Sequence, residues 1–131
     1  MSELITGIKG YSEEIVTEDR TASGMTSGGL PVYATPRMVS MMEYTAWSSV
    51  EPYMEEGKGT VGIHLDISHL AASPLGAHIY IDSELIEIDR RRLVFRVTAR
   101  DDEELIGEGK HERFIIDNEK FMAKTLAKAG K

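Results

Sequence analysis

Apolar and polar residues alternate with a period of two over most of the second half of the chain, which predicts β-strands with one face toward a core. Val61, Ile63, Leu65 and Ile67 share one face of a strand that begins after Gly59. The stretches between the alternating segments are short, so neighbouring strands are expected to pair antiparallel. Three further strands are predicted, from Ile79 to Ile88, over Leu93–Ala99 and over Leu105–Ile116, with turns at 73–76 and 101–103.

The middle of the chain has the pattern of one long helix. Thr35 is expected to be the N-cap, because threonine is a good capping residue and Pro36 suits the first helical position. The helix is predicted to run to Glu56 and to stop at Gly57, with Pro52 kinking it or ending it locally. Its apolar residues lie on most faces, so we expect it to be buried on most sides. They are Met38, Val39, Met41, Met42, Ala46, Trp47 and Val50.

One more strand is expected before the helix, and a glycine-rich loop separates the two. Residues 8–19 alternate loosely and lead into a predicted edge strand at 15–17, and residues 21–29 are expected to form a mobile loop. Asp117 and Asn118 are expected to cap a short C-terminal helix. This order of elements predicts an α+β fold in which a curved antiparallel sheet wraps one long helix. Such a sheet leaves open edges, so a dimer that extends it is expected.

Composition narrows the class of protein. A length of 131 residues predicts one domain spanning 1–131. The chain has no cysteine, which excludes disulfides, thiolate metal sites and cysteine nucleophiles. The net charge of −7 argues against a nucleic-acid partner, and Arg90–Arg92 are expected to form a solvated turn. The N-terminus lacks the pattern of a signal peptide and no apolar stretch is long enough to cross a membrane, so a cytoplasmic protein with no membrane partner is expected.

Three polar residues interrupt the apolar pattern. Glu43 lies on the apolar stripe of the helix, where an unpaired carboxylate is costly to bury. Of the 4 histidines, His69 is the one that the strand period places on the core side, whereas His64 lies on the opposite face. Thr35 begins the helix, beside unpaired backbone N–H groups that can stabilise an oxyanion. A hydroxyl, a carboxylate and an imidazole are the components of acyl transfer.

Each of these residues also has an ordinary structural explanation. The pattern is equally compatible with a Glu43 that points to solvent and with a core His69 that is bonded to backbone. A Thr35 that only caps the helix fits as well. Sequence separation alone does not show whether the three side chains meet.

The residues around these positions resemble the hot-dog thioesterases of the fluoroacetyl-coenzyme A thioesterase family. The resemblance extends from Gly10 to Ile116 and rests on the stretches 33–36, 38–39, 42–43, 60–62 and 68–76. It implies a hot-dog fold and a homodimer that hydrolyses acyl-coenzyme A near the subunit interface, without a metal or redox cofactor. It also implies the site residues, which are Thr35, Glu43 and His69 for catalysis and Gly62 and Arg113 for substrate contacts.

The resemblance further implies aromatic residues that gate the pocket ahead of the threonine, but residues 22–30 contain none. We therefore expect a different or broader acyl-coenzyme A substrate. Under this hypothesis His69 is a general base or acid, and Glu43 attacks the carbonyl or activates water. Two alternatives remain open, a non-catalytic acyl-coenzyme A-binding module and a hydratase or dehydratase, because a fold does not determine function.

Overall fold

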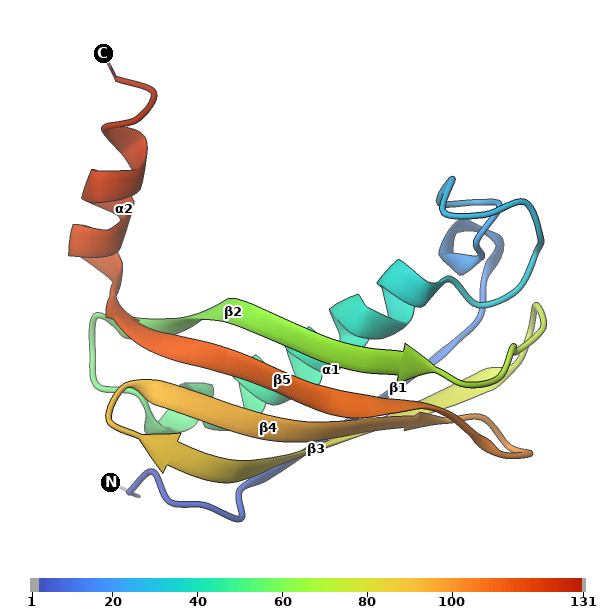
Figure 1. Ribbon diagram of the computed structural model, residues 1–131, viewed down its shortest axis with the longest axis horizontal. Helices are drawn as coiled ribbons and strands as arrows, with labels where there is room; N and C mark the ends of the chain where they lie inside the picture. The colour runs from blue at the N-terminus through green and yellow to red at the C-terminus, as the bar shows by residue number, and fades with distance from the viewer. Residues whose placement is uncertain (1–2, 131) are drawn as a thin grey trace.

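A five-stranded antiparallel sheet curves around one long helix in the computed structural model, which describes residues 3–130 (Figure 1). Residues 1, 2 and 131 of the predicted domain lie outside the described part. The strand order is β1-β3-β4-β5-β2, so β1 and β2 form the two edges of the sheet. The elements are β1 Lys9–Ile15, α1 Thr35–Val50, β2 Lys58–His69, β3 His78–Asp89, β4 Arg92–Arg100, β5 Leu105–Asp117 and α2 Asn118–Leu126, with 3-10 turns at Glu18–Arg20 and Glu51–Tyr53.

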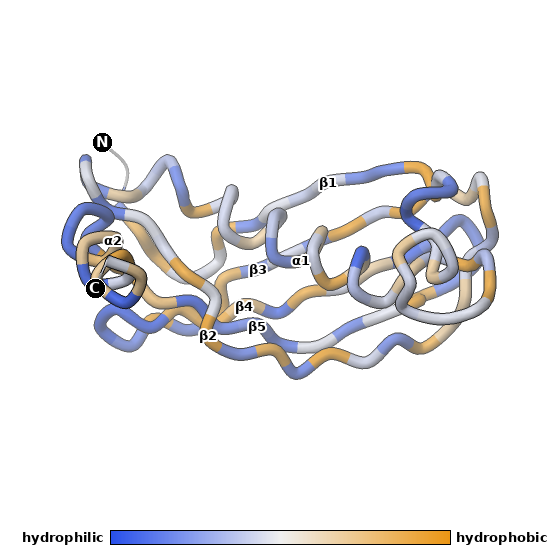
Figure 2. Tube along the Cα trace, turned by 90° about the horizontal axis from the view of Figure 1, so that it is seen from above, coloured by the Kyte–Doolittle hydropathy of each residue, from blue (hydrophilic) through white to orange (hydrophobic). Residues whose placement is uncertain are grey.

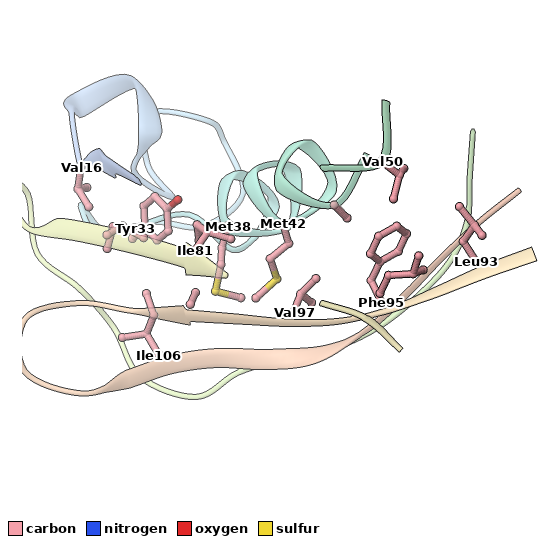
Figure 3. Close-up of a cluster of buried hydrophobic side chains, with 14 residues drawn as sticks. Val16, Tyr33, Met38, Met42, Val50, Ile81, Leu93, Phe95, Val97 and Ile106 are labelled. Carbon is pink, nitrogen blue, oxygen red and sulfur yellow. The ribbon is translucent and has the colours of Figure 1, made fainter. Parts of the chain in front are cut away.

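The core lies between α1 and the inner face of the sheet (Figure 3). Met38 and Met42 of α1 are fully buried and point toward strands whose alternate residues are also buried, including Phe95 and Val97 of β4. Gly107 on β5 makes this packing possible, because a Cβ atom there would lie 2.5 Å from the Met38 sulfur. The predicted architecture, one helix wrapped by an antiparallel sheet, is confirmed.

α1 begins one residue earlier than predicted. Ala34 is the N-cap with extended dihedral angles, and Thr35 and Pro36 are the first two helical residues. The predicted N-cap role of Thr35 is therefore wrong, and the cap makes no side-chain hydrogen bond. The Thr35 hydroxyl is left available for a contact outside the helix.

The C-terminal end of α1 also differs from the prediction. The helix ends at Val50, and Glu51–Tyr53 form a 3-10 turn around Pro52, which cannot continue the hydrogen-bond ladder. Gly57 has a φ of +85° and belongs to the later turn that leads into β2. The expectation of burial on most sides is also wrong for the single chain, because Tyr44 is 48% and Trp47 37% exposed.

β2 contains a bulge that decides which of its residues face α1. The register with β5 steps over Ile63, between Gly62 and His64. Gly62 lies opposite Arg113 and His69 lies opposite Gly107, and both of these partners are buried on the inner face of β5. An extra residue in one strand shifts the alternation by one. An even-numbered and an odd-numbered residue of β2 therefore both face the helix.

The predicted face of this strand is wrong in part. Val61 lies on the outer face, whereas Leu65 faces the helix beyond the bulge. Ile63 and Leu65 are 50% and 45% exposed, because β2 is an edge strand. His64 lies on the outer face, as predicted.

The ends of the chain follow the prediction in outline. The first strand covers residues 9–15 rather than 15–17, and it is an edge strand as expected. Asp117 caps α2 by accepting a hydrogen bond from the Lys120 backbone N–H at 3.1 Å. Hydrophilic and hydrophobic residues alternate along the strands (Figure 2). Within residues 3–130, neither helix has the length and apolar character needed to cross a bilayer.

Candidate active site

The N-terminus of α1 and the end of β2 meet at a hydrogen bond. Thr35 Oγ1 and His69 Nδ1 are 2.7 Å apart, although 34 residues separate them in the sequence. The first turn of a helix has unpaired N–H groups and carries the positive end of the helix dipole. A hydroxyl, an imidazole and a site that favours negative charge therefore lie together.

His69 has one nitrogen that the protein leaves unsatisfied. Its Nε2 is buried and has no hydrogen-bond partner among residues 3–130. Burial lowers the pKa of His69, and a backbone contact with Ala71 opposes this shift only in part. The imidazole is therefore neutral near pH 7 and can accept a proton. Buried polar atoms without a partner are rare and concentrate where a protein has a function for them.

A cavity of about 330 Å³ opens beside this pair. Thr35 and His69 form part of its wall, and the rest comes from the loop before α1 and the segment after β2. The loop before α1 therefore forms part of the pocket wall, while its mobility stays a prediction. The other lining residues are Ala22, Ser27, Val32, Tyr33, Leu70, Ala71 and Ala72.

Glu43, Gly62 and Arg113 form a second cluster. A Cβ atom on Gly62 would lie 2.9 Å from Glu43 Oε2, so glycine lets the carboxylate approach the β2 backbone. Arg113 Nη1 is 3.9 Å from the same carboxylate oxygen. The Arg113 side chain is only 9% exposed, and it donates further hydrogen bonds to the hydroxyl and carbonyl oxygens of Thr60. The guanidinium is therefore held in place on three sides.

His111 supports this second cluster and was missed by the sequence reasoning. It is fully buried, and its Nδ1–H donates to the His64 carbonyl oxygen at 3.0 Å, beside the bulge. Its Nε2 accepts from Arg113 Nη1 at 3.1 Å. Burial, together with the charge of Arg113, lowers the pKa of His111, so the ring is neutral and fixed in one tautomer. The prediction that His69 is the core-facing histidine is thus incomplete.

The two clusters do not meet within one chain. Thr35 and Glu43 are eight residues apart on α1, which corresponds to about 12 Å along the helix axis. Of the predicted site residues, the structure brings Thr35 to His69, and it separately brings Glu43 to Gly62 and Arg113. Within residues 3–130, no three His, Asp or Glu side chains are grouped so that they could hold a metal ion.

Known proteins share this arrangement of helix and sheet. Residues 16–119 match the model of the family described as fluoroacetyl-CoA-specific thioesterase. This chain belongs to that family. It is 41% identical, over 97 residues, to the fluoroacetyl-CoA thioesterase of Streptantibioticus cattleyicolor, a match covering 74% of this chain and 70% of the relative.

Solved structures of this thioesterase class have the same fold. The structure of the fluoroacetyl-CoA thioesterase FlK aligns with a TM-score of 0.90 at 33% identity, covering 97% of this chain and 98% of that one. A Thermus thermophilus protein described as a thioesterase superfamily member aligns with a TM-score of 0.90 at 28% identity, over 99% and 96% of the two chains. The predicted hot-dog thioesterase fold is confirmed.

In this member of the fluoroacetyl-CoA-specific thioesterase family, a buried carboxylate anchors the start of α1. The Glu14 side chain on β1 is 5% exposed and accepts hydrogen bonds from Arg37 and from the Tyr33 hydroxyl, the latter at 2.6 Å. Arg20 lies 3.3 Å from it. Tyr33 and Arg37 each lie two residues from Thr35, so this network fixes the segment that carries the Thr35 hydroxyl.

We expect Glu14→Gln to destabilise the fold in a pH-dependent way. Burial alone would raise the pKa of Glu14, but the bonds from Arg37 and Tyr33 and the nearby positive charges outweigh burial and lower it. A carboxyl group whose pKa is lowered by folding stabilises the protein above its unfolded pKa of about 4.3, and this contribution is lost as the pH falls through the folded value. Urea unfolding at pH 7 should show a loss of about 2 kcal/mol in the variant. At pH 3 the difference from the wild type should shrink, and an equal difference at both pH values would contradict this role.

Proposed function

We propose that the protein is an acyl-coenzyme A thioesterase. The observation that carries this proposal is the Thr35–His69 hydrogen bond beside an open cavity at the start of α1. Family membership supports it, since the Streptantibioticus cattleyicolor relative is named a fluoroacetyl-CoA thioesterase. A neutral imidazole with a free nitrogen, next to a helix N-terminus, is suited to hydrolyse a thioester.

The reaction follows from these groups. His69, protonated at Nδ1 and donating to Thr35 Oγ1, presents Nε2 as the base. Water attacks the thioester carbonyl carbon, its proton moves to Nε2, and the negative charge on the oxygen is stabilised by the first turn of α1. The C–S bond then breaks and the coenzyme A sulfur takes the proton from His69. The products are free coenzyme A and a carboxylic acid, which then loses its proton to solvent.

A homodimer completes the site in this proposal. β2 is a twelve-residue edge strand that exposes the apolar residues Ile63 and Leu65, and α1 exposes Tyr44 and Trp47. The other edge, β1, is shorter and charged, which disfavours pairing. Antiparallel pairing of two β2 strands about a two-fold axis between Gly62 and His69 brings Glu43 of one subunit toward His69 of the other. Glu43 then activates or orients the attacking water across the interface.

We expect the wild-type protein to elute as a dimer. The substitution Leu65→Arg is expected to weaken the association of the two subunits. Leu65 is 45% exposed in one chain and would be buried by β2 pairing, so a charge there opposes association. Size-exclusion chromatography with light scattering should show twice the mass of one chain for the wild type and a shift toward monomer for the variant. Tyr11→Arg, on the opposite edge strand, is the matched control and should remain dimeric. A stable wild-type monomer at micromolar concentration would argue against the dimer.

The substrate in this proposal is a small acyl-coenzyme A, and the pocket accepts more than one acyl group. The part of the wall that comes from residues 22–32 is built from the small or aliphatic side chains of Ala22, Ser27 and Val32. The cytoplasmic location expected from the sequence stays a prediction.

A panel of acyl-coenzyme A thioesters tests the proposed function. Release of free thiol, followed with a thiol reagent, is expected for several short acyl groups. Binding of these compounds without release would instead indicate a non-catalytic module. Loss of an enoyl chromophore without thiol release would indicate a hydratase.

The pH dependence of the reaction should follow His69. Because burial lowers the pKa of His69, the neutral base persists to a lower pH than for an exposed histidine. The acid limb of kcat/KM is therefore expected below the usual histidine value of about 6.5. His64→Ala should keep this limb, and the residual activity of His69→Ala should lack it. An acid limb centred well above pH 6.5 would exclude His69 as a buried neutral base.

A further inference from the structure

α2 has an apolar side that the single chain leaves partly exposed. It contains no buried residue, and Phe121, Met122 and Leu126 are 38%, 48% and 60% exposed. A nine-residue helix is marginal on its own, and most helices depend on tertiary packing of an apolar face. This helix is therefore expected to be covered by another molecule in the functional state.

The same helix carries a row of positive charge. Lys120 and Lys124 are one turn apart on α2, and Lys128 continues the spacing in the turn that follows. All three are exposed, and none takes part in the ion pairs found within residues 3–130. Residues four apart on a helix share a face. A chain with a net charge of −7 thus concentrates unpaired lysines at one terminus.

The position of α2 in the fold indicates which part of a dimer its lysines can contact. The helix follows β5 directly, at the end where Asp117 pairs with Lys58 at the start of β2. In Figure 1 it extends past the β2 edge of the sheet, on the side away from β3 and β4. Antiparallel pairing of two β2 strands brings the Lys58 end of one strand to the His69 end of the other. In the proposed dimer, α2 of one subunit would therefore lie beside the Thr35–His69 pocket of the other.

That pocket lacks cations of its own. None of its lining residues carries a full charge when His69 is neutral. The nearest arginines along the chain, Arg20 and Arg37, are held by Glu14. Coenzyme A carries a diphosphate and a ribose phosphate, which proteins bind with lysine and arginine. When the acyl group of an acyl-coenzyme A occupies this pocket, the negatively charged phosphates of the same molecule lie near a wall that has no positive charge to neutralise them.

We propose that α2 is a coenzyme A-binding element that acts on the active site of the second subunit. Lys120, Lys124 and Lys128 contact the phosphates. The proposal rests on the dimer and the acyl-coenzyme A site proposed above. It adds a binding role for a segment that catalysis does not use.

Binding of coenzyme A itself provides the first test, because it does not require hydrolysis. In calorimetry, the full-length variant Lys120→Gln/Lys124→Gln/Lys128→Gln should bind coenzyme A about tenfold more weakly than the wild type, or about 1.4 kcal/mol. The loss should be larger at low salt, since phosphate contacts of this kind are screened. The matched control is Lys9→Gln/Arg96→Gln/Lys110→Gln, which removes the same charge from the outer face of the sheet and should bind normally. Equal affinity of wild type and α2 variant would overturn the proposal.

Kinetics separate this role from the proposed reaction. With an acyl-coenzyme A that the wild type hydrolyses, the α2 variant should raise KM about tenfold with kcat little changed. With the same acyl group on pantetheine, which lacks the diphosphate and the ribose phosphate, both constants should match the wild type. An equal loss on both substrates would assign the lysines a structural role instead. If no thioester is hydrolysed, the proposed function fails, and the calorimetry still decides the binding role.

A mixed dimer tests whether the helix acts across the interface. One chain carries His69→Ala, and the other carries the three α2 substitutions with His69 intact. If α2 acts on the second subunit, the remaining active site is served by the unaltered helix, and KM should be near the wild-type value. If α2 acts within its own chain, KM should be raised as in the variant homodimer, which would contradict the proposal.

Discussion

His69→Ala is expected to lower kcat at least about a hundredfold, because general acid–base groups commonly contribute that much or more. In the proposed reaction, the buried Nε2, which has no hydrogen-bond partner among residues 3–130, takes the proton from water and returns it to sulfur. The variant should keep its melting temperature, since the side chain faces a cavity rather than the packed core. Steady-state thiol release on a substrate that the wild type turns over measures the effect. His64→Ala, on the outer face of the same strand, should retain full activity.

Thr35 gives a sharper form of the same test. Because Ala34 and not Thr35 is the N-cap, Thr35→Ala removes no capping hydrogen bond and should cost little stability. It does remove the hydroxyl that lies 2.7 Å from His69 Nδ1, so kcat should fall strongly. Thr35→Ser, which keeps the hydroxyl, should retain much of the activity. Full activity in both Thr35→Ala and His69→Ala would remove the proposed site and leave only the fold.

Glu43→Gln is the second substitution from which a large effect is expected. It keeps the shape of the side chain and removes the charge that faces Arg113 Nη1 at 3.9 Å. If Glu43 activates water across the dimer interface, kcat should fall about a hundredfold or more. Glu55→Gln removes an equal charge from the exposed turn after α1 and serves as the control. Unchanged kcat in Glu43→Gln would restrict the reaction to Thr35 and His69.

Gly62→Ala tests the same cluster through the backbone. The added Cβ atom would lie 2.9 Å from Glu43 Oε2 and 3.3 Å from Arg113 Nη1, so the carboxylate must move. We expect reduced kcat with a folded dimer, because flexible side-chain ends yield before the backbone does. In combination with Glu43→Gln, the second substitution should add little, since both act on one interaction.

The order of elements could be predicted because periodicity survives along most of the chain. Leu93, Phe95, Val97 and Ala99 alternate along one strand and are all buried as the pattern requires, although Val94 between them is buried as well. Pro52 and Gly57 both signal a helix end, but only the nearer one acts, because a proline without an N–H already breaks the ladder. Periodicity and the signals for helix ends therefore predicted which elements form, but they predicted the boundaries of those elements less accurately.

The candidate site was predictable only in part, for reasons of register. His69 was placed on the inner face by counting in twos from Val61, yet Val61 itself points outward, because the bulge at Ile63 lies between them. The prediction for His69 was therefore correct only because the wrong face assumed for Val61 and the unrecognised bulge compensate for each other. His111 could have been found from the buried alternation of β5, where it precedes Arg113 by two residues. Its contact with the His64 carbonyl oxygen depends on pairing across strands, which sequence spacing does not reveal.

The bulge at Ile63 also determines whether the interval between Gly62 and His69 must be odd or even for both residues to face the helix. Gly62 and His69 are separated by seven positions, and a regular strand would turn residues with odd separation to opposite faces. Deleting Ile63 would leave an even interval between Gly62 and His69 and would restore a regular ladder with β5. The bulge and the odd interval are therefore expected to occur together or not at all. A relative with both residues and an even interval between them should therefore have an unbroken second strand. A single insertion or deletion that leaves the bulge in place would instead turn the imidazole away from the hydroxyl.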